Sequence, residues 1–196
     1  MKKRVIAFAI AATTVGGTAL AVAPVASAAS HGGACVLSGT ASFDGAGLTG
    51  TGGPFTYSFS GTLSNCQSSS SGAPTGGSVF AGLNGLNHST GSGGCSQSTT
   101  AGESIIQWND GKTTVIKYTT TGAAAAVALQ GTVVAATTET DPLTLLPLYT
   151  TNEPSTPVGD SSLGQLTFGT TSPQDCALSG LKSASINGLV EVGSPS

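Results

Sequence analysis

The fold is decided by Phe55-Thr-Tyr-Ser-Phe-Ser-Gly-Thr-Leu63, where aromatic or aliphatic residues and one glycine alternate with four hydroxyl residues. Successive side chains of a β-strand point to opposite faces of a sheet, so this strict alternation predicts a strand with one buried face. The stretch Cys35-Val-Leu-Ser-Gly-Thr-Ala-Ser-Phe43 alternates in the same way. The glycine-rich linker 44–54 between them predicts that the two strands form a long hairpin.

Further strands are predicted along the rest of the chain. Asn109-Asp-Gly111 separates two β-branched runs, 103–108 and 112–118, and Asx-Gly in such a place is a strong hairpin signal. Ala123–Gln130 would favour a helix by propensity, but it lacks charges and has strands around it, so we expect a buried strand. We expect strands also at 77–82, 162–170 and 181–192, and loops at 83–94 and 137–162.

These patterns predict an all-β protein with about eight or nine antiparallel strands and no helix. Short strands with turn signals between them are typical of sandwiches and barrels. Our first expectation is an Ig-like antiparallel β-sandwich, and the alternative is a small closed β-barrel.

The first 28 residues have the organisation of an export signal. Met1-Lys-Lys-Arg4 is a short positive head, 5–23 is an uncharged apolar run, and Ala26-Ser-Ala28 supplies the small residues that a signal peptidase accepts. We therefore expect cleavage after Ala28 and a secreted, extracellular β domain formed by residues 29–196. No second apolar stretch in this mature chain is long enough to span a bilayer.

The charge of the mature chain disfavours two classes of partner. The mature chain would keep three lysines and no arginine against nine acidic residues, which gives a net charge of −6. So few cations cannot line a groove that follows phosphates, so nucleic acid is not expected as a partner. An anionic membrane surface is disfavoured for the same reason.

The four cysteines of an exported chain predict two disulfides. Four cysteines allow three pairings, and we expect Cys35–Cys66 and Cys95–Cys176. The first would close the open end of the predicted hairpin, and the second would tie a mid-chain strand to the C-terminal segment. No Cys-x-x-Cys spacing occurs, so we expect neither a metal site nor a cofactor.

Three segments together resemble a known group of proteins. They are Cys35–Phe43, Phe55-Thr-Tyr-Ser-Phe-Ser-Gly-Thr-Leu-Ser-Asn-Cys66 and Trp108-Asn-Asp-Gly-Lys-Thr-Thr-Val115. They are similar to uncharacterised small secreted actinobacterial β-sandwich proteins, and the resemblance covers most of the mature chain. It implies secretion and a β fold, and it carries over no catalytic residue.

Candidates for catalysis are few. His88 lies in a polar loop and is the one plausible histidine base, and no Gly-x-Ser-x-Gly nucleophile elbow occurs. Glu103 and Asp110 flank Trp108 and would be the paired carboxylates of a glycoside or ester hydrolase. A simpler interpretation makes Asp110 the turn residue of the hairpin and Glu103 an acid at a strand edge.

An apolar segment inside a polar loop suggests a surface instead. Asp141-Pro-Leu-Thr-Leu-Leu-Pro-Leu-Tyr149 contains two prolines, which disfavour a central strand. It would either cover an open end of the core or dock a partner or lipid. The candidate ligand or partner surface therefore consists of Trp108, Asp110, Leu143, Leu145, Leu146, Leu148 and Tyr149.

The leading hypothesis is a secreted, non-enzymatic β protein with a binding or structural role. Its partner would be an extracellular polymer, a protein or an apolar ligand. One alternative is the secreted hydrolase that uses Glu103 and Asp110. The other is a carrier that holds an apolar ligand inside a barrel or between sheets.

Overall fold

A computed structural model describes residues 33–169, 176 and 179–193, so the predicted signal peptide lies outside the described residues. These residues form nine strands: β1 (Gly33–Phe43), β2 (Pro54–Ser68), β3 (Gly77–Ala81), β4 (Ser89–Gly93), β5 (Gln97–Trp108), β6 (Thr113–Ala123), β7 (Ala126–Val134), β8 (Ser161–Gly169) and β9 (Ser183–Val192). None of the described residues belongs to a helix that is long and apolar enough to cross a membrane.

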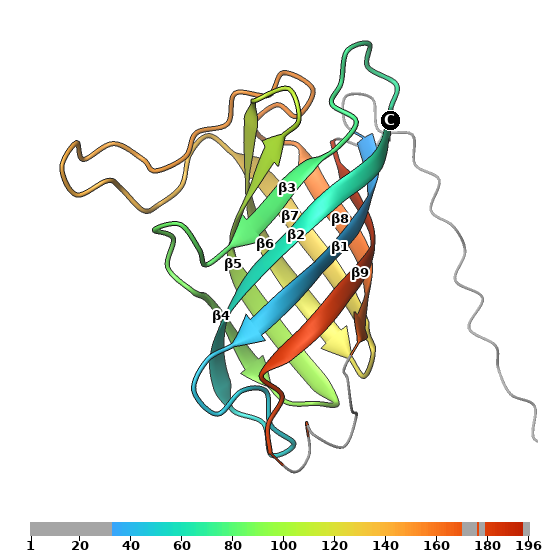
Figure 1. The fold of residues 1–196 in the computed structure, drawn as a ribbon, viewed down its shortest axis with the longest axis vertical. Coiled ribbons are helices and arrows are strands. Elements are labelled where there is room, and N and C mark those ends of the chain that lie inside the picture. Colours follow the sequence, from blue (N-terminus) through green and yellow to red (C-terminus); the bar gives the residue numbers. More distant parts are fainter. Residues whose placement is uncertain (1–32, 170–175, 177–178, 194–196) are drawn as a thin grey trace, which may run out of the picture.

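All nine strands belong to one antiparallel sheet that closes on itself (Figure 1). Its order is β1-β9-β8-β7-β6-β5-β3-β2, and β2 pairs back onto β1. Strands β3 and β4 share one position in the wall, because β3 pairs with Phe59–Leu63 of β2 and β4 pairs with Pro54–Tyr57. The result is a barrel with eight strand positions.

The sandwich that we expected first is therefore not what the structure contains, and the barrel alternative fits it. Alternation determines which face of each strand is buried. It does not determine whether the buried faces meet across two sheets or around a central axis. Here β1 pairs with β2 on one side and with β9 on the other, so this position offers no edge at which two sheets could separate.

Most of the predicted strands are present, with two differences. The β1–β2 hairpin places Leu37 opposite Leu63, and the Asx-Gly turn joins β5 to β6. The expected loop 83–94 contains strand β4, which is short and made only of serine, threonine and glycine. The expected buried strand Ala123–Gln130 is divided by a turn, because Ala124 adopts a positive φ of 51° between β6 and β7. It is not buried either, since its residues in β7 alternate between exposed and half-buried.

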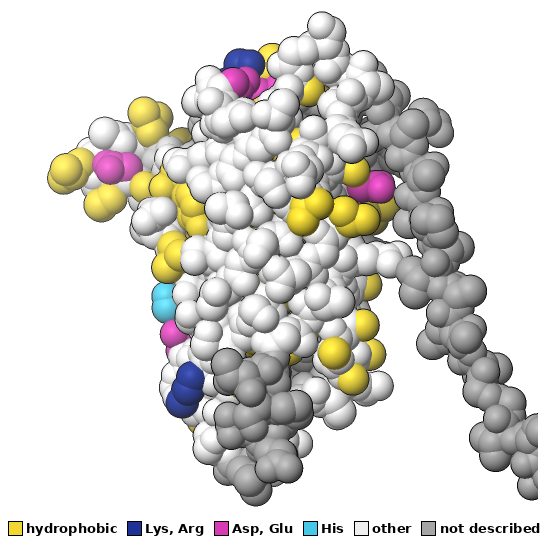
Figure 2. All heavy atoms as spheres, turned by 45° about the vertical axis from the view of Figure 1, so that its right-hand side comes forward, with side chains coloured by type: hydrophobic (Ala, Val, Ile, Leu, Met, Phe, Trp, Pro, Cys, Tyr) yellow, Lys and Arg dark blue, Asp and Glu magenta, His cyan; other side chains and the backbone are white. Residues whose placement is uncertain are grey.

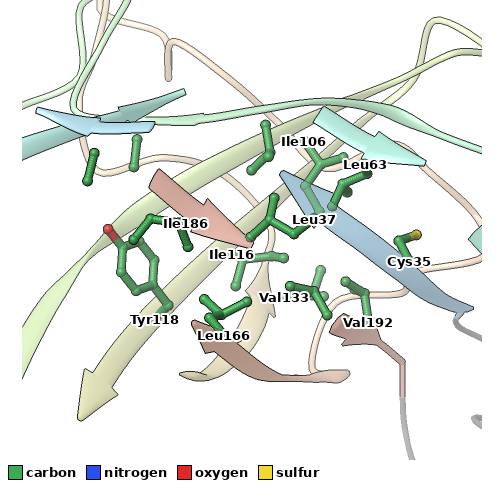
Figure 3. Packing of buried hydrophobic residues seen from close by; sticks show 14 of the residues in the cluster. Cys35, Leu37, Leu63, Ile106, Ile116, Tyr118, Val133, Leu166, Ile186 and Val192 are labelled. Atoms are coloured by element: carbon green, nitrogen blue, oxygen red, sulfur yellow. The ribbon is translucent and has the colours of Figure 1, made fainter. Parts of the chain in front are cut away.

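The core lies inside the barrel (Figure 3). Inward-facing side chains from all the long strands meet there, among them Leu37, Leu63, Ile106, Ile116, Tyr118, Val133, Leu166, Ile186 and Val192. Gly39 and Gly61 face each other across β1 and β2. A Cβ atom added to Gly39 would lie 2.6 Å from Cζ of Phe59, and one added to Gly61 would lie 2.9 Å from it. The absence of side chains at these two glycines therefore leaves space for the Phe59 ring.

A smaller apolar cluster lies on the outside of the wall. Ile105 and Val115 point outward from β5 and β6, yet both are 0% exposed. They pack with Phe80 and Leu86, and Leu148 and Tyr149 lie against the same cluster. The segments around 83–86 and 148–149 therefore cover one side of the barrel.

The two disulfides join Cys35 to Cys66 and Cys95 to Cys176, which is the pairing that the sequence favoured. Such bonds are consistent with an extracellular location. Cys176 packs with Leu48, Leu181 and Ala184 at the end of the barrel where β1 ends and β2 begins. We call this the phenylalanine end because Phe43, Phe55 and Phe168 lie there, and it is the lower end in Figure 1.

Candidate ligand cavity in the barrel

The structure does not bring the predicted surface residues together at one site. Trp108 is 6% exposed and faces into the barrel, where its indole N–H donates to Oγ1 of Thr114 at 2.8 Å. Asp110 lies in the hairpin turn and forms a 2.8 Å ion pair with Lys112. Trp108 is therefore a core residue at the end opposite the phenylalanine end, and it presents no exposed face beside Asp110.

Glu103 faces away from Trp108. It lies an odd number of positions from Trp108 on β5, so it projects from the outer surface of the wall. Its carboxylate accepts a hydrogen bond from the backbone N–H of Thr138 at 3.0 Å, and Glu139 accepts one from the N–H of Asn87 at 3.2 Å. Glu103 thus holds the loop at Thr138 against the barrel, and Glu139 joins that loop to the one at Asn87.

Glu103, Glu139, His88 and Lys117 line a wide, open groove of about 670 Å³ on this outer surface. His88 contacts the carboxylate of Asp44, with 2.5 Å between Nδ1 and Oδ2. The hydrogen bond from Thr56 lowers the pKa of Asp44, and the hydrogen bond with His88 lowers it to a smaller extent. Among the residues that the structure describes, no three His, Cys, Asp or Glu side chains group as metal ligands would.

The apolar segment 141–149 is divided between two environments. Leu148 is half-buried, and the ring of Tyr149 packs edge-on against Phe80 with 5.5 Å between the ring centres. Leu143, Leu145 and Leu146 are 92%, 75% and 64% exposed on a loop that projects from the barrel (Figure 2). The segment therefore covers the outside of the wall, and only its tip is free.

A mainly apolar cavity of about 130 Å³ lies inside the barrel. A cavity of about 150 Å³ lined by aliphatic and aromatic side chains is known to hold a benzene molecule, so this space matches one small ring. The lining comes from all around the wall, with Phe43, Phe55, Phe59, Leu129, Phe168 and Ile186 among its apolar members.

Aromatic rings form the wall of the cavity near the phenylalanine end. Phe43 contacts Phe55 edge-to-face with ring centres 5.7 Å apart, and it lies 6.0 Å from the rings of Phe168 and Tyr57. Pairs at these distances and tilts have the geometry that aromatic rings prefer. The rings therefore form a connected surface against which a flat apolar molecule can pack.

Hydroxyl groups line the β5–β6 side of the same cavity. Four of these, together with Ser89, form a connected series of hydrogen bonds that we call the hydroxyl chain: Ser89, Tyr118, Tyr57, Thr100 and Thr120. The oxygen–oxygen distances along it are 2.9, 2.7, 3.0 and 2.7 Å. All its members except Ser89 line the cavity, so the hydroxyl chain is its main polar feature.

Both tyrosines of the hydroxyl chain remain protonated at neutral pH. Burial raises the pKa of Tyr57, and burial raises the pKa of Tyr118 well above its usual value. Each phenol therefore keeps its hydrogen and can donate one hydrogen bond.

The sequence suggested an apolar ligand inside a barrel only as an alternative and did not identify the residues that line this cavity, although one signal for them was present. Ser98, Thr100 and Thr120 occupy positions whose side chains face inward, where an alternating strand of a filled barrel would carry apolar residues. No family model, curated protein or solved structure matches the chain. Its function must therefore be inferred from the cavity and its lining.

Proposed function

We propose that the protein is a secreted, non-enzymatic binding protein that holds one small, mainly apolar molecule inside its barrel. The observation that carries the proposal is the apolar cavity of about 130 Å³, whose lining combines packed aromatic rings with a few linked hydroxyl groups. Eight-stranded barrels are just wide enough either to be filled by side chains or to hold one small ligand. Ligand sites of this kind are mostly apolar, with a few placed polar groups.

Secretion is supported by the predicted signal sequence and by the two disulfides. The hydrolase alternative has less support. Glu103 and Trp108 lie on opposite faces of β5, and Asp110 is engaged by Lys112 in a turn. The two carboxylates therefore do not face one cleft beside Trp108, as the paired acids of such an enzyme would have to.

Ala41 allows the proposal to be tested by filling the cavity. This residue is buried on β1 and lines the cavity, whereas its neighbour Thr40 is exposed on the outer face of the same strand. We expect Ala41→Leu to weaken toluene binding at least tenfold because the larger side chain takes the space of the ligand. Thr40→Leu, the matched control, should leave binding unchanged.

Toluene binding to the secreted protein would be measured by NMR titration, and thermal unfolding would show that both variants are folded. Native mass spectrometry of freshly secreted protein adds a second measurement, with a bound small molecule as the expected result. The proposal is wrong if the wild-type protein shows neither a bound molecule nor toluene binding. It is also wrong if folded Ala41→Leu protein binds toluene as tightly as the wild type.

A further inference from the structure

The hydroxyl chain has a direction, which follows from counting hydrogens. Each hydroxyl has one hydrogen to donate and two lone pairs that can accept. Tyr118 donates its hydrogen to Oγ of Ser89. Because this hydrogen is used, the 2.7 Å contact between the two phenols requires Tyr57 to donate to Tyr118.

The direction of donation continues to Thr120, the last member of the hydroxyl chain. Tyr57 has used its hydrogen, so Thr100 must donate across the 3.0 Å contact to Tyr57. Because the hydroxyl hydrogen of Thr100 is then used, Thr120 must donate its hydrogen across the 2.7 Å contact to Thr100. Thr120 is left with no hydrogen to offer, and its Oγ1 accepts no hydrogen bond from any described residue.

The hydroxyl of Thr120 can therefore accept a hydrogen bond from a ligand in the cavity but cannot donate one to it. Gly122, the next inward residue of β6, carries no side chain, and Ser98 of β5 faces Gly122 across the strand pair. The Ser98 hydroxyl also lines the cavity, on the side toward the phenylalanine end, and it can donate to a ligand oxygen. A ligand oxygen that donates to Thr120 and accepts from Ser98 would satisfy both groups.

The lack of charged side chains in the cavity lining restricts the chemical class of the ligand further. None of the described residues that line the cavity has a charged side chain. An ammonium or a carboxylate group would be buried there without a counter-charge, at a large cost in desolvation. The polar group of the ligand must therefore be neutral.

We propose that the ligand is a small neutral alcohol or phenol whose hydroxyl donates a hydrogen bond to Oγ1 of Thr120 while its apolar body packs against the phenylalanine rings. This inference rests on the proposed binding function and specifies the chemical class of the ligand. It predicts discrimination between molecules of nearly equal size. Thr120 is half-buried, and a ligand that covers its oxygen without donating to it leaves the acceptor unsatisfied.

The test compares phenol, toluene and anisole as probes, with dissociation constants measured by NMR titration. Phenol carries a donor, toluene has no polar group, and anisole has an oxygen but no donor. In Thr120→Val, which keeps the shape of the side chain and loses the oxygen, we expect the preference for phenol over toluene to fall about threefold to tenfold, as for one neutral hydrogen bond. Thr120→Ser should restore it.

Thr121→Val is the matched control, because Thr121 is the next residue of β6 and is exposed on the outer face. It should leave the preference for phenol unchanged. If wild-type protein binds toluene and the phenol preference is the same in Thr120→Val, the proposed class is wrong and the binding function stands. The class is also wrong if anisole binds as tightly as phenol. If the wild type binds none of the three probes, the binding function itself fails and the inference fails with it.

Discussion

Replacing Cys95 and Cys176 together with serine is expected to lower the free energy of unfolding by about 4 to 5 kcal/mol, from the entropy of closing so long a loop. The two residues are 81 positions apart. Their bond holds the C-terminal segment, with Leu181, against Leu48 at the phenylalanine end. Urea denaturation followed by circular dichroism measures the change.

The other disulfide serves as the matched comparison. Cys35 and Cys66 are 31 positions apart, and hydrogen bonds along the β1–β2 ladder already hold their strands together. We expect the double serine variant of this pair to lose less free energy of unfolding, about 3 to 4 kcal/mol, because the closed loop is shorter. A loss below about 1 kcal/mol for the Cys95–Cys176 pair would contradict the view that this bond stabilises the end of the barrel.

Trp108→Ala is expected to cost about 3 to 5 kcal/mol of unfolding free energy, as for other large buried aromatic residues. The indole fills the core at the end opposite the phenylalanine end, and its N–H donates to Thr114. Thr114 in turn contacts Thr156 at 2.6 Å, and all three side chains are buried. Trp108 is the one tryptophan of the chain, so unfolding should be followed by circular dichroism and not by tryptophan fluorescence.

Leu143→Ala provides the contrast, because Leu143 was predicted in the same candidate surface as Trp108 but is 92% exposed. Its truncation should change stability by no more than about 0.5 kcal/mol. Equal effects of the two substitutions would mean that Trp108 is not part of the core.

The sequence predicted individual strands well because alternation is a local property. Leu37 and Leu63 were expected on the buried faces of a hairpin, and they are. The closure of the sheet was not predictable in the same way, since it depends on pairing between β1 and β9 at opposite ends of the chain. Strand β4 was missed because its serine, threonine and glycine residues give no apolar pattern.

The candidate site was predicted less well than the fold. Trp108 was predicted in the candidate ligand or partner surface, but it continues the inward series of Ser104 and Ile106 on β5. The cavity depends on residues from strands far apart in sequence, so no single motif encodes it. The export signal, the secreted location and the resemblance to actinobacterial proteins stay predictions.

The pairing of the first and last strands also has a consequence for the kinetics of folding. Gly33 lies opposite Val192, so the final ladder joins residues separated by nearly the whole described chain. Non-local pairings of this kind are slow to form, because the entropy of bringing distant segments together is lost before the contacts are gained. Until β9 arrives, β1 and β8 each present an unpaired edge, and such edges pair readily with other chains. The nascent barrel is therefore expected to be most prone to aggregate just before its last strand is in place.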